Sequence, residues 1–163
     1  MRLEPFADTY AQTVARWVGS DAELFWLAPA TAPPITPEKI IAWSTPADRH
    51  AYLLWLSASN MPIGYAELGR MSDRTTHMWL GHFLLSPAYR GQGLSAAFLK
   101  LLLAEAREVH GARRVALVVF PANMPAVRCY QREGFVIAGY EHRRFDPSGK
   151  HHRMLRMDLD LNS

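Results

Sequence analysis

Apolar residues recur at helical spacing in the first third of the chain. Residues 7–18 carry apolar side chains three or four positions apart, which predicts an amphipathic helix. A Pro-rich stretch follows at residues 29–37, and Pro37 suits the first turn of a short helix that runs through Trp43. We therefore expect this third of the chain to be helical and irregular.

Strand-like segments follow at residues 51–58, 62–68 and 77–85. They are separated by the turn sequences Asn60-Met61-Pro62 and Ser72-Asp73-Arg74. Three strands joined by such short turns predict an antiparallel meander.

The strongest helix prediction begins just after Gly93 and ends at Gly111. One face of this segment is apolar and is formed by Leu94, Ala97, Phe98, Leu101, Leu102 and Ala106. Residues 115–120 follow with a continuous apolar run, which is typical of a strand covered on both faces.

The remainder of the chain predicts one more helix and two more strands. A short helix from Asn123 to Arg132 ends at Gly134. Residues 135–145 and 153–161 are strand-like and flank the turn Asp146-Pro147-Ser148-Gly149. The order of elements predicts a mixed α/β domain over residues 1–163.

Composition narrows the class of protein. The 163 residues are 49% hydrophobic and 20% charged, as in an ordinary globular domain. One cysteine excludes a disulfide framework and a multi-cysteine metal site, and the adjacent His151 and His152 make a poor metal signature, so we expect no metal. The net charge of +3 comes without a nucleic-acid-binding motif, and no apolar run is long enough for a membrane span or a secretory signal. We expect a soluble, cytoplasmic protein that binds neither nucleic acid nor membrane.

The segment from Leu84 to Ser95 carries the clearest chemistry. An apolar strand runs into a turn with two glycines, and the long helix starts there. A helix N-terminus with free N–H groups is suited to a phosphate, and Arg90 adds a charged donor beside it. This pattern predicts an anion site.

Two motifs resemble the GNAT superfamily of acyl-CoA-dependent N-acyltransferases. Arg90, Gly93 and Ser95 fill the three places of the family's Gln/Arg-x-x-Gly-x-Gly/Ala pyrophosphate loop, with a serine where the family has glycine or alanine. Residues 123–130 (Asn-Met-Pro-Ala-Val-Arg-Cys-Tyr), followed by Gly134-Phe135, match its second signature. The resemblance covers about the C-terminal half of the chain. It implies a twisted, mostly antiparallel sheet of about six or seven strands flanked by helices, with acetyl-CoA in a split between two parallel strands.

The resemblance also implies which residues bind acetyl-CoA. Tyr130 occupies the place of the family's general acid, which would protonate the departing thiolate, and it also borders the cofactor. The full implied cofactor-binding set is Phe83, Leu84, Leu85, Arg90, Gly91, Gln92, Gly93, Leu94, Ser95, Ala96, Asn123 and Tyr130.

The general base has several candidates. Glu67 lies on a strand expected to border the acceptor side, where a partly buried carboxylate would take a proton directly or through water. His82 is the next candidate because histidine titrates in a useful range. Trp79 and Val118 stand where relatives carry glutamates, so those two bases are absent.

The expected activity is transfer of an acetyl group from acetyl-CoA to a primary amine by direct attack in a ternary complex. A small amine, an amino-acid derivative, a peptide N-terminus and an antibiotic all remain open as acceptors. The alternative is a non-catalytic acyl-CoA-binding sensor. A homodimer through an exposed final strand is one expected assembly.

Overall fold

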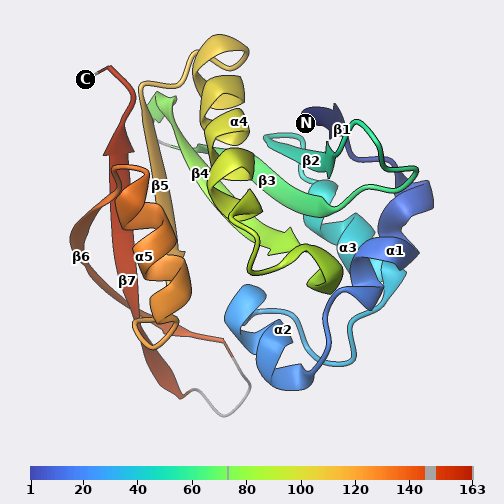
Figure 1. Cartoon of the computed structure of the whole chain (residues 1–163). Coiled ribbons are helices and arrows are strands. Elements are labelled where there is room, and N and C mark those ends of the chain that lie inside the picture. The colour runs from blue at the N-terminus through green and yellow to red at the C-terminus, as the bar shows by residue number, and fades with distance from the viewer. Residues whose placement is uncertain (73, 146–149, 163) are drawn as a thin grey trace.

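A computed structural model describes residues 1–72, 74–145 and 150–162 of the chain. Seven strands, five α-helices and two short 3-10 helices are described in this part of the protein (Figure 1). In chain order they are β1 (Arg2–Pro5), η1 (Asp8–Tyr10), α1 (Ala11–Arg16), α2 (Asp21–Leu27), α3 (Pro37–Ser44), β2 (Arg49–Trp55), β3 (Gly64–Met71), β4 (Arg74–Leu85), η2 (Pro87–Tyr89), α4 (Leu94–Glu108), β5 (Arg114–Val119), α5 (Met124–Arg132), β6 (Val136–Arg144) and β7 (His151–Asp160).

The strands form one mixed sheet in the order β1-β2-β3-β4-β5-β7-β6. Every neighbouring pair is antiparallel except β4 and β5, which are parallel. The parallel pair arises because α4 carries the chain from the end of β4 back to the start of β5. This confirms the predicted mixed, mostly antiparallel sheet flanked by helices.

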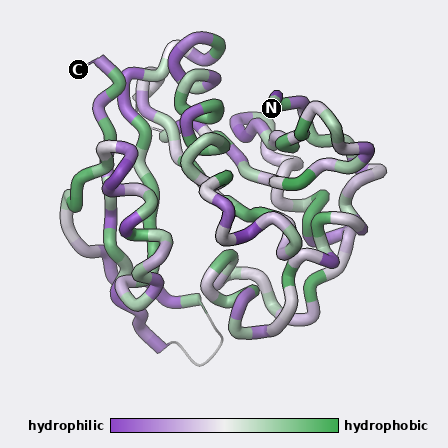
Figure 2. The backbone as a smooth tube through the Cα atoms, viewed as in Figure 1, coloured by the Kyte–Doolittle hydropathy of each residue, from purple (hydrophilic) through white to green (hydrophobic). Residues whose placement is uncertain are grey.

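Helices cover both faces of the sheet. Side chains on β2 alternate between the faces, so Leu54 packs in the cluster that contains Phe98 and Leu102 of α4, and Leu53 packs in the cluster that contains Ile40 of α3. The first cluster also includes α5 residues, and the second includes residues from α1 and α2. Figure 2 shows hydrophilic and hydrophobic positions alternating along α4, as its amphipathic sequence predicts. None of the helices in residues 1–72, 74–145 and 150–162 combines the length and apolarity needed to cross a bilayer.

The structure corrects two predictions, about the final strand and the first helix, and adds one strand. The final strand, β7, is not exposed at an edge, because it pairs with β5 on one side and β6 on the other; β6 is the edge strand. Strand β1 was not predicted, and the helix predicted over residues 7–18 is divided into η1 and α1. A homodimer and a cytoplasmic location stay predictions. Asp73 of one predicted turn and the whole turn 146–149 lie outside the described residues.

The feature that positions the site is the separation of β4 from β5. Their pairing is confined to three steps, and it ends at Trp79 opposite Ala116. Beyond this point β5 stays paired with β7 through Val119, so the opening lies on its β4 side. A cleft therefore divides the sheet where the two parallel strands diverge.

Candidate active site

The strand cleft, as we call the opening between β4 and β5, has a volume of about 390 Å³. Residues from the second half of β4, the start of α4, β5, α5 and α2 line it. Backbone groups along the β5-facing edge of β4 have no strand opposite them within the described chain beyond Trp79. Because buried backbone N–H and C=O groups require partners, this edge suits an extended ligand rich in amides.

A β-bulge bends β4 where it lines the cleft. Tyr65 pairs with Leu84 and Glu67 pairs with Gly81, so His82 and Phe83 together oppose the single residue Ala66. His82 has a φ of 47°, which is unusual for a residue with a side chain. The bulge re-aims this stretch of the strand, as bulges near functional sites commonly do.

The anion site predicted from the sequence would lie at the start of α4. Gly93 occupies the N-cap position in a left-handed conformation (φ 76°) and has no side chain to accept from the first N–H groups of the helix. Gly91 is also left-handed (φ 75°), and a Cβ at either glycine would meet nothing within 4 Å. The backbone conformation, rather than crowding by the protein, therefore requires glycine at both positions. The free N–H groups and the helix dipole suit a phosphate.

Replacing Gly93 by alanine is expected to weaken CoA binding about tenfold. A left-handed residue with a Cβ costs roughly 1–2 kcal/mol, and a loop that relaxes from this conformation misaligns N–H groups whose hydrogen bonds to a charged ligand contribute roughly 1.5–3 kcal/mol each. Isothermal titration calorimetry with CoA measures the change. Gly111 is the matched control: it is left-handed (φ 67°) with the same free space, but it lies beyond the C-terminal end of α4. Equal loss of CoA affinity in G93A and G111A would contradict the assignment.

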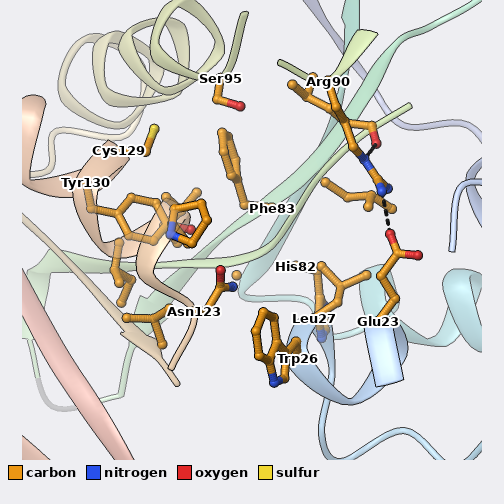
Figure 3. A pocket seen from close by; sticks show the side chains of 18 of the residues that line it. Glu23, Trp26, Leu27, His82, Phe83, Arg90, Ser95, Asn123, Cys129 and Tyr130 are labelled. Atoms are coloured by element: carbon orange, nitrogen blue, oxygen red, sulfur yellow. Dashed lines mark hydrogen bonds and ion pairs between the residues drawn. The ribbon is translucent and has the colours of Figure 1, made fainter. Parts of the chain in front are cut away.

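Arg90 makes three hydrogen bonds to protein groups. Its Nε donates to the carbonyl of Leu85 (3.1 Å), its Nη2 donates to the carbonyl of Trp17 (3.0 Å), and its Nη1 pairs with Glu23 of α2. Figure 3 shows this pair at the rim of the cleft. The guanidinium therefore ties α2 and the segment before it to the glycine loop, and binding of Arg90 to pyrophosphate stays a prediction.

Helix α5 supplies Tyr130 and Asn123 to the opposite wall of the cleft. Asn123 precedes the first helical residue, and its side chain lines the cleft instead of capping the helix. Tyr130 is 8% exposed, and its ring lies 6.2 Å from that of Phe83, centroid to centroid (Figure 3). Burial, with a smaller contribution from Cys129, raises the pKa of the Tyr130 phenol above its ordinary value. The phenol is therefore a proton donor at neutral pH.

Glu67 is a buried carboxylate with polar contacts to three side chains. It is only 2% exposed, so its side chain does not face solvent. The hydroxyl of Tyr65 donates to its Oε2 (2.8 Å), the Nδ1 of His82 lies 2.7 Å from the same oxygen, and the Nη1 of Arg49 lies 3.4 Å from Oε1. Burial and the Glu67 charge raise the pKa of the Tyr65 phenol, which keeps that donor protonated.

His82 connects this carboxylate to both openings of the protein. Its ring stacks on Trp43 at 4.0 Å with 20° between the planes, and its Nδ1 points at Glu67. A carboxylate beside Nδ1 favours the tautomer with the proton on Nδ1, which leaves Nε2 with a free lone pair. His82 lines the strand cleft and also a second pocket.

The second pocket, which we call the arginine pocket, has a volume of about 400 Å³. It meets the strand cleft at Leu80, Gly81, His82 and Val118, and Trp26 and Leu27 of α2 border both. Its charged lining residues are Asp48, Arg49, Glu67, Arg70 and Arg143. Two openings that share a histidine backed by a buried carboxylate allow two ligands to meet at that side chain.

The structure brings most of the predicted site residues together. Eight predicted cofactor-binding residues line the strand cleft, namely Phe83, Leu84, Leu85, Arg90, Gly91, Ser95, Asn123 and Tyr130. Gln92, Gly93, Leu94 and Ala96 belong to the same loop and first helical turn but are not among the lining residues, and the side chain of Gln92 donates to the carbonyl of Ala88. Glu67 lines the arginine pocket. The roles of these residues stay predictions.

Helix α2 is the main element of the site that was not predicted from the sequence. It brings Glu23 to Arg90 and places Trp26, 47% exposed, over both openings. A local signal was present: Ser20 caps the helix by accepting from the N–H of Glu23, and Glu23 accepts from the N–H of Gly19. The Ser-x-x-Glu spacing is that of a capping box, which marks a helix start.

Comparison with known proteins agrees with this fold. Residues 13–135 match the acetyltransferase (GNAT) family. The chain belongs to this family.

Individual relatives match over shorter stretches. The spermine/spermidine N(1)-acetyltransferase of Bacillus subtilis is 32% identical over 82 residues, which are 47% of this chain and 54% of the relative. The mycothiol acetyltransferase of Corynebacterium glutamicum is 48% identical over 54 residues, 33% of this chain and 18% of the relative. The chain thus spans about half the length of the first of these relatives and less of the second. A crystal structure of spermidine N-acetyltransferase from Vibrio cholerae with CoA and spermine superposes with a TM-score of 0.80 at 15% identity, covering 98% of this chain and 95% of the other, which shows a shared fold.

Proposed function

We propose that the protein is an acetyl-CoA-dependent N-acetyltransferase that acetylates a primary amine by direct attack in a ternary complex. The observation that carries the proposal is the meeting of the strand cleft and the arginine pocket at His82, which Glu67 backs. One opening fits a phosphate-bearing, amide-rich donor, and the other admits an amine. No residue is required to hold the acetyl group covalently.

Different groups of the protein bind different parts of the acetyl donor. The N–H groups at the start of α4 take the pyrophosphate, and the free edge of β4 pairs with the amides of the pantetheine arm. A backbone N–H of β4 beside the cleft stabilises, in this proposal, the oxyanion that forms on the thioester carbonyl. The donor supplies an activated acetyl group as a thioester.

His82 and Tyr130 carry out the proton transfers of the reaction. An aliphatic amine arrives protonated, since its ordinary pKa is about 10.4. His82 takes this proton through Nε2 while Glu67 holds Nδ1, and the nitrogen lone pair then forms the C–N bond. The C–S bond breaks, and the Tyr130 phenol protonates the departing thiolate. The attached nitrogen then loses its extra proton, which restores the phenol and leaves a neutral amide. This assigns Glu67 to positioning His82, because the carboxylate is enclosed by its own donors.

A thiol-release assay with acetyl-CoA and a panel of amines tests the proposal. The panel contains amino acids, amino-acid amides, short peptides, polyamines and aminoglycosides. Release above the amine-free rate for at least one class is expected. CoA binding without release for any amine would favour the non-catalytic sensor, and absence of CoA binding would contradict the cofactor site itself.

A further inference from the structure

The charges of the arginine pocket point to the chemical class of the acceptor. Three arginines, Arg49, Arg70 and Arg143, line it against two carboxylates, Asp48 and Glu67, among the lining residues that the structure describes. The carboxylates and the arginines are not equally available to a ligand, because their existing partners differ.

The acidic side offers little to a substrate cation. Glu67 is buried and already accepts from Tyr65, with His82 and Arg49 also beside it. Of the two lining carboxylates, Asp48 is thus the one left to face a ligand. A polyamine, which carries several positive charges along its length, would need more acidic groups than this.

The arginines of the pocket keep more hydrogen-bonding groups available to a ligand than the carboxylates do. Arg70 donates to the backbone carbonyls of Thr75 and His110, which fix its guanidinium without neutralising it. To the described residues Arg49 makes only long hydrogen bonds, 3.3 Å to the carbonyl of Trp43 and 3.4 Å to Glu67, and both use Nη1. Its Nε and Nη2 donate to no other side chain or carbonyl in the described residues.

Arg143 lies on the edge strand β6, near the C-terminal end of the chain, and lines the pocket from there. It shares Glu141 with Arg156, and both guanidiniums lie over the Trp79 ring, at 5.9 Å and 5.2 Å from its centroid. Arg143 donates to Glu141 through Nε and Nη2, and Arg156 also pairs with Asp158, so the two arginines of this wall have two carboxylate partners. Among the described residues, Nη1 of Arg143 has no such partner, and it is the group of this wall that can bind an anion. Arginine also forms strong paired hydrogen bonds with a carboxylate or phosphate.

We infer that the arginine pocket binds the acceptor through an anionic group, so that the preferred acceptor is a small amine carrying a carboxylate or a similar anion rather than a polyamine. The inference rests on the proposed function. The amine reaches His82 at the junction with the strand cleft, and the anion faces Arg49 and Arg143 deeper in the pocket. Trp26 and Trp79 provide apolar walls between these ends.

Matched acceptors test the charge preference directly. Each α-amino acid is compared with its C-terminal amide, which keeps the size and the amine but lacks the anion, and spermidine is included. For the best side chain, kcat/KM is expected to be at least tenfold higher for the acid than for the amide, with spermidine below both. The R143Q variant should bring the acid-to-amide ratio towards one through a higher KM for the acid. The R144Q variant should keep the ratio, because the neighbouring Arg144 does not line the pocket and its Nε points to His151.

A binding measurement separates this inference from the proposed function. Calorimetric titration of the same acids and amides into the protein with CoA present does not depend on acetyl transfer. Tighter binding of the acids, lost in R143Q and kept in R144Q, would support the anion site even if no amine were acetylated. Equal binding of acids and amides, or a preference for spermidine in either assay, would overturn it.

Discussion

Replacing Tyr130 by phenylalanine is expected to lower kcat by about 10²–10⁴-fold, the range for loss of a positioned general acid. The ring packing against Phe83 and Phe135 is kept, since the variant removes only the hydroxyl. CoA affinity should therefore stay within about twofold, because the hydroxyl acts on the thiolate in the transition state and not on bound CoA. Steady-state kinetics with acetyl-CoA and calorimetric CoA titration measure both quantities.

The pH profile gives a second test of Tyr130. Burial raises the pKa of its phenol, so the phenol keeps its proton below pH 10, the ordinary value for tyrosine. Over the pH range in which the protein stays folded, we therefore expect no fall in wild-type kcat from loss of the Tyr130 proton. Y140F is the control variant, because Tyr140 lies exposed on β6 away from the cleft. A fully active Y130F would remove the assigned acid.

Replacing Glu67 by glutamine is expected to lower kcat by about 10²-fold, the lower end of the effect of a positioned acid or base. Glutamine keeps the volume, and its oxygen can take the place of Oε1, which accepts from Arg49. Its NH₂ group then takes the place of Oε2, which both Tyr65 and His82 contact, donates to Nδ1 of His82 and favours the tautomer that carries the proton on Nε2. The base would then be unavailable to the amine. The KM for acetyl-CoA should change little, since Glu67 does not line the strand cleft.

A double-mutant cycle with His82 decides whether the two residues act as a unit. If Glu67 works by positioning His82, the double variant E67Q/H82Q should be no slower than H82Q alone. Additive losses would instead mean that Glu67 acts on the amine independently of His82. Unfolding free energies of all three variants should be measured alongside, because Glu67 is buried and its loss also acts on stability.

The parts of the fold that carry local signals could be predicted from the sequence. The apolar face of α4, the two glycines before it and the run of apolar residues in β5 each indicate their element within a single segment. Strand β1 was missed because four residues with one apolar side chain, Leu3, form no recognisable alternation. Its strand conformation comes from pairing with β2, which no local pattern reveals.

The residues of the site likewise fall into those that a local motif predicts and those that it does not. The glycine loop and the Asn123–Tyr130 helix are contiguous motifs, so sequence alone was enough to name them. The partners of Glu67 come from β2, β3 and β4, and the arginine pocket unites Arg49 with Arg143 from distant strands. Only the register of the sheet brings such side chains together. Arg90 meets its partner Glu23, which lies 67 residues away, through the packing of α2 against the glycine loop, and no local pattern reveals this contact either.

The ion pair between Arg90 and Glu23 couples the proposed donor site to the proposed acceptor site. Arg90 belongs to the loop that leads into α4, while Glu23 belongs to α2, whose Trp26 and Leu27 line the arginine pocket. A shift of either segment therefore changes the energy of the other, and thermodynamic linkage requires that each substrate alter the affinity of its partner by the same factor. Substitutions that reshape α2 for a new acceptor consequently act on the affinity for the acetyl donor as well.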